Sequence, residues 1–394
     1  MKNRKPSLHW LSSAWLYAIF IPIILIFSLS CRGTGGYPTE RLITDGVETI
    51  INPDYPRDKT VEVALEDSLI IGAQKSNENP VFNRISDVAV DDAGRIFALD
   101  RGDVQVKVFS SSGDPLLTFG SRGQGPGDFG TPGSIGLSSA GHFLINDVEN
   151  RRIEVFSREG SYLKEWKIEG PGYLIGVDRS GNVFMSKGTR WDKETGLEER
   201  IFDRHSEAGS WLNQVAIVEA MTGTPRVFRG KPGFTRTGYE HGAINYMLDE
   251  DGRLYLGCSS EYVFSHYDGN GKLMRKFGRR FKPISVRAED TQRIFGKLAP
   301  DFESLMPKTK PPFRPLGVAL LEENGQLWVP TFERESEGLT YDIFGPDGIY
   351  EDKFFIRANP QELKPLFFKA GYLYSIDTNA EGLHIVRRSK INIR

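Results

Sequence analysis

The feature that most constrains the fold of this chain is a repeat with a period of 47 residues. Residues 87–113 and 135–160 follow the same plan, in which an apolar strand, a glycine turn and two further short strands succeed one another. The first turn glycines of the two copies, Gly94 and Gly141, stand 47 residues apart. Glycine adopts the positive φ of a tight turn between antiparallel strands, and alternating apolar residues give each strand one buried face. Each copy is therefore predicted to be a small antiparallel sheet.

Weaker copies of the same unit continue along the chain, and the series of first turn glycines is Gly94, Gly141, Gly181, Gly252, Gly325 and Gly371. The intervals are 47, 40, 71, 73 and 46 residues, and about 40–50 residues is the length of one four-stranded propeller blade. The two long intervals carry insertions at about 211–242 and 283–315. Six copies predict an all-β fold, a six-bladed β-propeller with four-stranded antiparallel blades. The strand-like residues 61–65 precede the first copy, and we expect them to close the ring by pairing with the last blade.

The second insertion is predicted to contain a short helix at about 288–306. One face of this helix would carry the apolar residues Ile294, Phe295, Leu298, Phe302 and Leu305. Pro300 would kink or divide the helix. We expect the apolar face to pack on the rim of the propeller, and a partner-binding helix is the alternative.

Residues 1–31 have the layout of a secretory signal peptide, with three basic residues among the first five, an apolar run at 14–29 and then Cys31. The small residues before Cys31 resemble the lipobox of bacterial lipoproteins, in which this cysteine is diacylated and becomes the mature N-terminus. Ser28 departs from the pattern, because leucine is common at its position. A permanent transmembrane anchor is the alternative, but the run is shorter than the ~20 residues of a spanning helix and contains Pro22.

Either interpretation places the rest of the chain outside the cytoplasm. We therefore predict a lipoprotein signal peptide at 1–31 with acylated Cys31, a tether and lead-in at 32–59, and the propeller at 60–394. Arg32 stands where the aspartate associated with inner-membrane retention would stand, so the resemblance predicts an outer-membrane lipoprotein of the cell envelope, facing the periplasm or the cell surface. The membrane would then be a partner through the lipid anchor.

Two stretches connect the repeats with a known family. Residues 147–156 (Asp-Val-Glu-Asn-Arg-Arg-Ile-Glu-Val-Phe) lie close to the NHL pattern of Asp, Asn, Arg, Ile and Phe, and residues 119–129 look like the linker between two NHL blades. The copies resemble NHL repeats and, more closely, the six-bladed β-propeller lipoproteins of Bacteroidetes-like bacteria, over about residues 60–390. This resemblance implies the fold but hardly the function, because propellers support binding, scaffolding and unrelated chemistries.

Charge and cysteine content narrow the function classes. The net charge is -2, from 50 basic and 52 acidic residues, and no basic stripe is visible, so we expect no nucleic-acid partner. Of the two cysteines, Cys31 is assigned to lipidation, and Cys258 lies in a strand-like context as a small buried hydrophobe. Asp100 and Asp147 hold equivalent repeat positions and are predicted to accept hydrogen bonds from turn amides.

No catalytic constellation is present, and no catalytic residue is predicted. The preferred hypothesis is a binding or scaffolding module that contacts an envelope protein, peptide or glycan through its loop face; the sequence leaves its cofactor open, including none. The alternative is a metal-dependent propeller enzyme, of lyase or lactonase type, with zinc or calcium at the central channel. Peptidyl-hydroxyglycine lyases, which also use NHL-like blades, assemble such a site from single residues on different blades. The candidates here are His241 and Asp87 as metal ligands and Arg314 as a channel binding residue.

Overall fold

The computed structural model describes residues 36–73, 75–76, 79–170, 172–191, 197–221, 224–228, 231–235, 239, 241–298, 300, 303, 306–314, 320–321, 324–357 and 363–393. All of these but Gly36 belong to one compact unit, Tyr37–Arg394. The predicted signal peptide with Cys31 lies outside the described residues, so lipidation stays a prediction.

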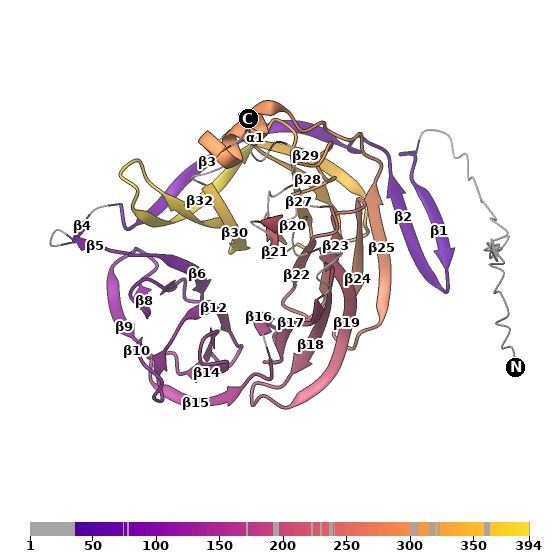
Figure 1. The fold of residues 1–394 in the computed structure, drawn as a ribbon. Coiled ribbons are helices and arrows are strands. Elements are labelled where there is room, and N and C mark those ends of the chain that lie inside the picture. The colour runs from indigo at the N-terminus through magenta and orange to yellow at the C-terminus, as the bar shows by residue number, and fades with distance from the viewer. Residues whose placement is uncertain are drawn as a thin grey trace, which may run out of the picture. The chain divides into compact units, whose positions relative to one another are not determined.

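The unit is a six-bladed β-propeller, as the repeats predict, and its blades surround a common centre (Figure 1). In the first three blades the four antiparallel strands follow one another from the centre outward. They are β6 (Ile85–Val90), β7 (Ile96–Asp100), β8 (Gln105–Phe109) and β9 (Pro115–Phe119) in blade one; β12 (Pro132–Leu137), β13 (Phe143–Asp147), β14 (Arg152–Phe156) and β15 (Tyr162–Lys167) in blade two; and β16 (Gly172–Val177), β17 (Val183–Trp191), β18 (Leu197–His205) and β19 (Trp211–Met221) in blade three.

Blade four carries two additional strands on its outer side. Its own strands are β22 (Ile244–Leu248), β23 (Leu254–Cys258), β24 (Val263–Tyr267) and β25 (Leu273–Arg279). The strand β2 (Val47–Asn52) pairs in parallel with β25, and β1 (Glu40–Thr44) completes a hairpin with β2. This part of the predicted lead-in is therefore paired to the propeller.

Blades five and six share one eight-stranded sheet, in which the ring is closed. Blade five comprises β26 (Leu320–Leu321), β27 (Leu327–Thr331), β28 (Gly338–Phe344) and β29 (Tyr350–Arg357), and blade six comprises β30 (Leu363–Lys369), β31 (Tyr372–Thr378), β32 (His384–Ile393) and, outermost, β3 (Lys59–Ile71). Leu65 of β3 pairs with Ile391 of β32 in antiparallel register. The prediction that residues 61–65 pair with the last blade is confirmed, and β3 also pairs in parallel with β29.

Short elements occupy the connections between blades. They are the strand pairs β4 (Lys75–Ser76) with β5 (Asn79–Pro80), β10 (Ser121–Arg122) with β11 (Asp128–Phe129), and β20 (Thr224–Phe228) with β21 (Lys231–Thr235), the helix α1 (Ala288–Phe295) and a 3-10 turn at Gly296–Leu298. Since strands alternate in direction, these connections share one face with the loops between the second and third strand of each blade. We call this the loop face, and the opposite face, with its short glycine turns, the turn face.

The predicted insertion helix is present but ends earlier and is attached differently from expectation. It stops at Phe295, because Gly296 takes a φ of 55°. Its buried residues are the polar Asp290 and Thr291, whereas Ile294 and Phe295 are only half-buried. The side chains of Leu298, Phe302 and Leu305 lie outside the described residues.

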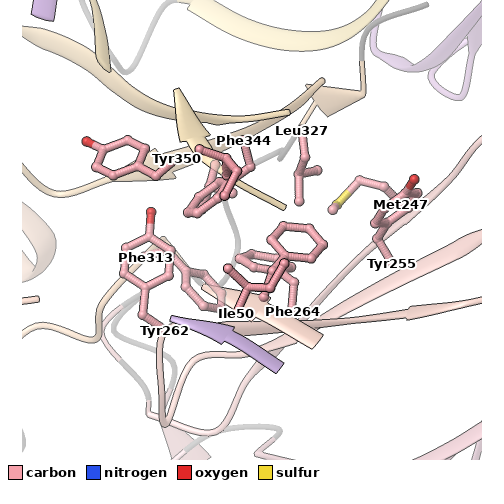
Figure 2. Packing of buried hydrophobic residues seen from close by; sticks show 12 residues of the cluster. Ile50, Met247, Tyr255, Tyr262, Phe264, Phe313, Leu327, Phe344 and Tyr350 are labelled. Atoms are coloured by element: carbon pink, nitrogen blue, oxygen red, sulfur yellow. The ribbon is translucent and has the colours of Figure 1, made fainter. Parts of the chain in front are cut away.

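The hydrophobic core is divided among the junctions between blades. Figure 2 shows the cluster between blades four and five, where Phe264 and Phe277 of blade four face Phe344 and Tyr350 of blade five, and Ile50 enters from β2. The rings of Phe277 and Phe344 lie 5.5 Å apart between centroids. Each blade therefore buries its two faces against its neighbours, and the loop face rests on a tightly packed scaffold.

Candidate binding surface on the loop face

Two buried aspartates fix the chain where it enters the first strands of blades one and two. The carboxylate of Asp100 accepts hydrogen bonds from the amides of Asn83 and Arg84, both at 2.8 Å. Asp147 accepts from the amides of Gly130 and Thr131, both at 2.9 Å. The predicted role of both residues is confirmed. Their side chains hold the loop face rigid rather than offering a ligand contact.

Asp87 lies on the innermost strand of blade one, as a channel candidate should. Its Oδ2 accepts a hydrogen bond of 3.0 Å from the amide of Ile135 in blade two, and its Oδ1 accepts one of 2.9 Å from the amide of Val88. Burial raises the pKa of the Asp87 carboxyl to about 6. Both carboxylate oxygens of Asp87 thus accept hydrogen bonds from backbone amides. The side chain thereby joins the inner strand of blade one to that of blade two.

His241 precedes β22, and its Nε2 lies 3.1 Å from the carbonyl oxygen of Thr309 in the second insertion. His241 precedes the inner strand of blade four, whereas Asp87 lies on the inner strand of blade one. Among the residues that the structure describes, no three His, Cys, Asp or Glu side chains gather as metal ligands. Cys258 is half-buried with a free thiol, 3.1 Å from the hydroxyl of Ser260.

Arg314 has an unsatisfied donor near the channel. Its Nε donates to the carbonyl of Thr331 at 2.8 Å, and its own carbonyl accepts from Asn245 of β22 at 2.8 Å. The guanidinium lies over the ring of Phe332, and burial lowers the pKa of Arg314. Its Nη2 is buried without a hydrogen-bond partner among the described residues.

A buried ion cluster beside Arg314 attaches the insertion helix, and sequence reasoning missed it. Lys310 Nζ lies 3.0 Å from Asp290 Oδ1 and 2.5 Å from Glu335 Oε2. Arg293 Nη2 lies 2.7 Å from Glu335 Oε1, to which the hydroxyl of Tyr239 donates at 3.0 Å. Burial alone would raise the pKa of Asp290, but hydrogen bonds from a backbone amide and from Lys310 hold it below its ordinary value. These groups come from four separate segments, and no local sequence signal joins them.

A small pocket opens on the loop face where blades two and three meet. Its volume is about 200 Å³, and its lining is Val148, Arg151, Ile168, Gly170, Gly172 and Tyr173. Tyr173, at the start of the inner strand β16, is 48% exposed. Arg151 is exposed and its guanidinium has no ion-pair or hydrogen-bond partner in the described part of the chain. The pocket therefore combines the aromatic ring of Tyr173 and the cationic side chain of Arg151 with two lining glycines, Gly170 and Gly172.

Tyr173 begins the inner strand of blade three, as Tyr246 lies on that of blade four and Asp87 on that of blade one. Burial raises the pKa of Tyr246; the Arg200 guanidinium opposes this shift, while the Asp87 carboxylate and the Tyr173 phenol add to it. Sequence reasoning named Asp87 as a channel candidate but did not single out Tyr173 or Arg151.

No helix in the described ranges is both long enough and apolar enough to cross a bilayer.

Comparison with known proteins supports the class that the repeats suggest. No family model matches the sequence. It is 32% identical to human NHL repeat-containing protein 3 over 100 residues, which are 24% of this chain and 29% of that protein, and 29% identical to the mouse protein over the same shares. The chain thus spans less than a third of the curated relatives that it matches.

Solved structures from two Bacteroides species share the fold. A candidate exported protein from Bacteroides fragilis superposes with a TM-score of 0.52 at 11% identity, covering 86% of this chain and 99% of that one. A member of the DUF4221 family from Bacteroides vulgatus gives 0.51 at 9% identity, covering 84% and 99%. The protein is an NHL-like β-propeller.

Proposed function

We propose that this propeller is a membrane-tethered, extracytoplasmic binding module that holds a protein, peptide or glycan of the cell envelope on its loop face. The tether rests on the pattern of residues 1–31, with Cys31 as the lipidated residue. The fold shared with a candidate exported protein agrees with a location outside the cytoplasm. Binding by the loop face rests on the pocket between blades two and three.

The arrangement of the loop face suits recognition. The first predicted insertion, 211–242, is in part the outer strand β19 of blade three; its remaining hairpin β20–β21 and the second insertion belong to connections on this face. Loops on a rigid scaffold are where binding sites concentrate. Asp100 and Asp147, each fully buried, fix the loops from below. A partner would therefore meet a preformed surface and lose little free energy in ordering it.

The chemistry of the pocket indicates what it can hold. The half-exposed ring of Tyr173 offers a flat face for a sugar ring or an apolar side chain. The guanidinium of Arg151 can form two parallel hydrogen bonds with a carboxylate. This combination favours an acidic sugar or a peptide carboxylate. No observation on the described residues favours the metal-dependent alternative, which needs a third ligand beside His241 and Asp87.

The experiment is site-specific photo-crosslinking of the full chain in intact cells. A photoreactive residue at position 173 should give discrete adducts, and Arg151→Ala should reduce their yield at least several-fold. A photoreactive residue at Arg158, exposed on the turn face, is the matched control. Equal adducts from positions 173 and 158, or none from 173, would contradict binding at this pocket.

A further inference from the structure

The junction where the ring closes, between blades six and one, contains a cavity of about 670 Å³. Its lining is mixed: Lys107 and Thr118 join the apolar Ile70 and Ile71 of β3, Val81, Phe109 of β8 and Leu116 of β9. Ile70 and Leu116 are 41% and 50% exposed. Apolar side chains exposed around a cavity with polar groups at its margin are a feature of interaction sites.

The side chain that meets the next blade's turn glycine is smaller at this junction than at three of the other five; the junctions between blades three and four and between blades five and six also lack an aromatic residue there. At three other junctions an aromatic residue of one blade's outer strand meets a turn glycine of the next blade: Phe119 meets Gly160, Trp166 meets Gly209 and Phe277 meets Gly348. At the ring closure the corresponding pair is Leu69 and Gly113. Because leucine fills less space than an aromatic ring, the outer part of this junction is left unfilled.

The cavity lies beside an exposed strand edge. β3 pairs with β32 along residues 63–71, but its pairing with β29 on the other side ends at Val63. No described strand pairs with residues 64–71 of β3 on that side. This edge therefore presents backbone amides and carbonyls that an added strand could use.

The molecule itself shows how such a junction is filled, between blades four and five. There β2 runs parallel to the outer strand β25, with Ile50 opposite Phe277. Ile50 is fully buried in the core of that junction (Figure 2), and its Cδ1 lies 3.5 Å from where a Cβ on Gly348 would stand. The side chain of Asn52 donates to the carbonyls of Gly278 and Gly348, at 2.8 and 2.9 Å.

We propose that the junction between blades six and one docks an extended segment of a partner protein, which adds to the edge of β3 as β2 adds to β25. A branched apolar side chain of that segment enters the cavity between Ile70 and Leu116. Strand addition supplies affinity through main-chain hydrogen bonds, and the cavity selects the side chain. This site lies at the outer rim, apart from the loop-face pocket, and does not depend on it.

A phage-displayed library of linear peptides, panned on soluble residues 37–394, tests this site. Enriched peptides should carry Ile, Leu or Val within a strand-favouring sequence, and Leu116→Lys should weaken their binding at least tenfold. Tyr173→Ala on the loop face is the matched control and should leave binding unchanged. Hydrogen exchange should slow at the amides of residues 65–71 when a peptide binds.

Other outcomes overturn the proposal. Peptides that lose binding on Tyr173→Ala but not on Leu116→Lys would assign the recognition to the loop face. A wild-type dimer that Leu116→Lys converts to a monomer would make a second copy of this chain the occupant. Failure to enrich any peptide that discriminates Leu116→Lys from wild type would also reject the site.

Discussion

Replacing Asp342 by asparagine should lower the thermal midpoint of the propeller by several degrees without changing its fold. Asp342 of β28 is fully buried and accepts hydrogen bonds from Arg279 Nε at 2.7 Å and from the hydroxyl of Tyr350 at 2.6 Å. The hydroxyl of Tyr262 donates to the same carboxylate. Arg279 belongs to β25, so this network joins blade four to blade five.

The magnitude follows from the burial of the arginine. The Asp342→Asn substitution would leave the guanidinium of Arg279, only 6% exposed, with a neutral amide in place of its near partner and only the more distant carboxylate of Glu333, at 3.4 Å. Breaking one side of a buried ion pair costs about 3–5 kcal/mol. The unfolding entropy near the midpoint is about 2.1 cal/mol/K per residue, or roughly 0.75 kcal/mol/K for the unit Tyr37–Arg394. The midpoint should therefore fall by about 4–7 °C.

Calorimetry on soluble residues 37–394 measures this effect. Glu250→Gln is the matched control, because the pair of Glu250 with Arg179 is exposed on both sides and such pairs contribute at most about 1 kcal/mol. A second variant, Arg279→Met with Asp342→Leu, removes the unpaired charge but leaves the buried hydroxyls of Tyr262 and Tyr350 without this acceptor, so it should recover only part of the loss. A midpoint for Asp342→Asn within 1 °C of wild type would refute the reasoning.

Two further predictions concern other parts of the chain. Burial raises the pKa of the Glu154 carboxyl to about 7 from 4.5, so the folded state binds more protons than the unfolded state between these values. The free energy of unfolding should therefore fall as pH rises from about 4.5 to 7, and Glu154→Gln should make this fall smaller, leaving the part that Asp87 contributes. Urea unfolding at both ends of the window checks it, and equal slopes in both proteins would contradict it. Cys31→Ser should abolish the incorporation of a labelled fatty acid and move the chain from the membrane to the soluble fraction, whereas unchanged membrane association would favour a transmembrane anchor.

The fold was predictable because each blade is a local unit. A turn glycine such as Gly94 and the alternating strand residues around it lie within one stretch of sequence. One sequence repeat therefore predicts one antiparallel sheet. The closure by residues 61–65 was predictable as well, since a ring must end on a strand from the other terminus.

The site was less predictable because its contacts cross from blade to blade. The sequence placed Asp87 on an inner strand. The backbone amide that donates a hydrogen bond to its carboxylate, that of Ile135, belongs to the next blade and could not be foreseen. A helix at about 288–306 was predicted from its apolar residues, and the structure has α1 at Ala288–Phe295. The described attachment is the pairing of Asp290 with Lys310, which no periodicity reveals. Tyr173 of blade three lines the pocket only because a loop of blade two, with Val148 and Arg151, forms the opposite wall.

Ring closure also determines when during synthesis the propeller can finish folding. The side chain of Asn392 donates to Glu66, 326 residues earlier in the chain, so β3 waits for β32. Contacts of such separation form slowly. A nascent chain lacking β32 therefore cannot complete blade six, and the ring stays open until β32 has been synthesised.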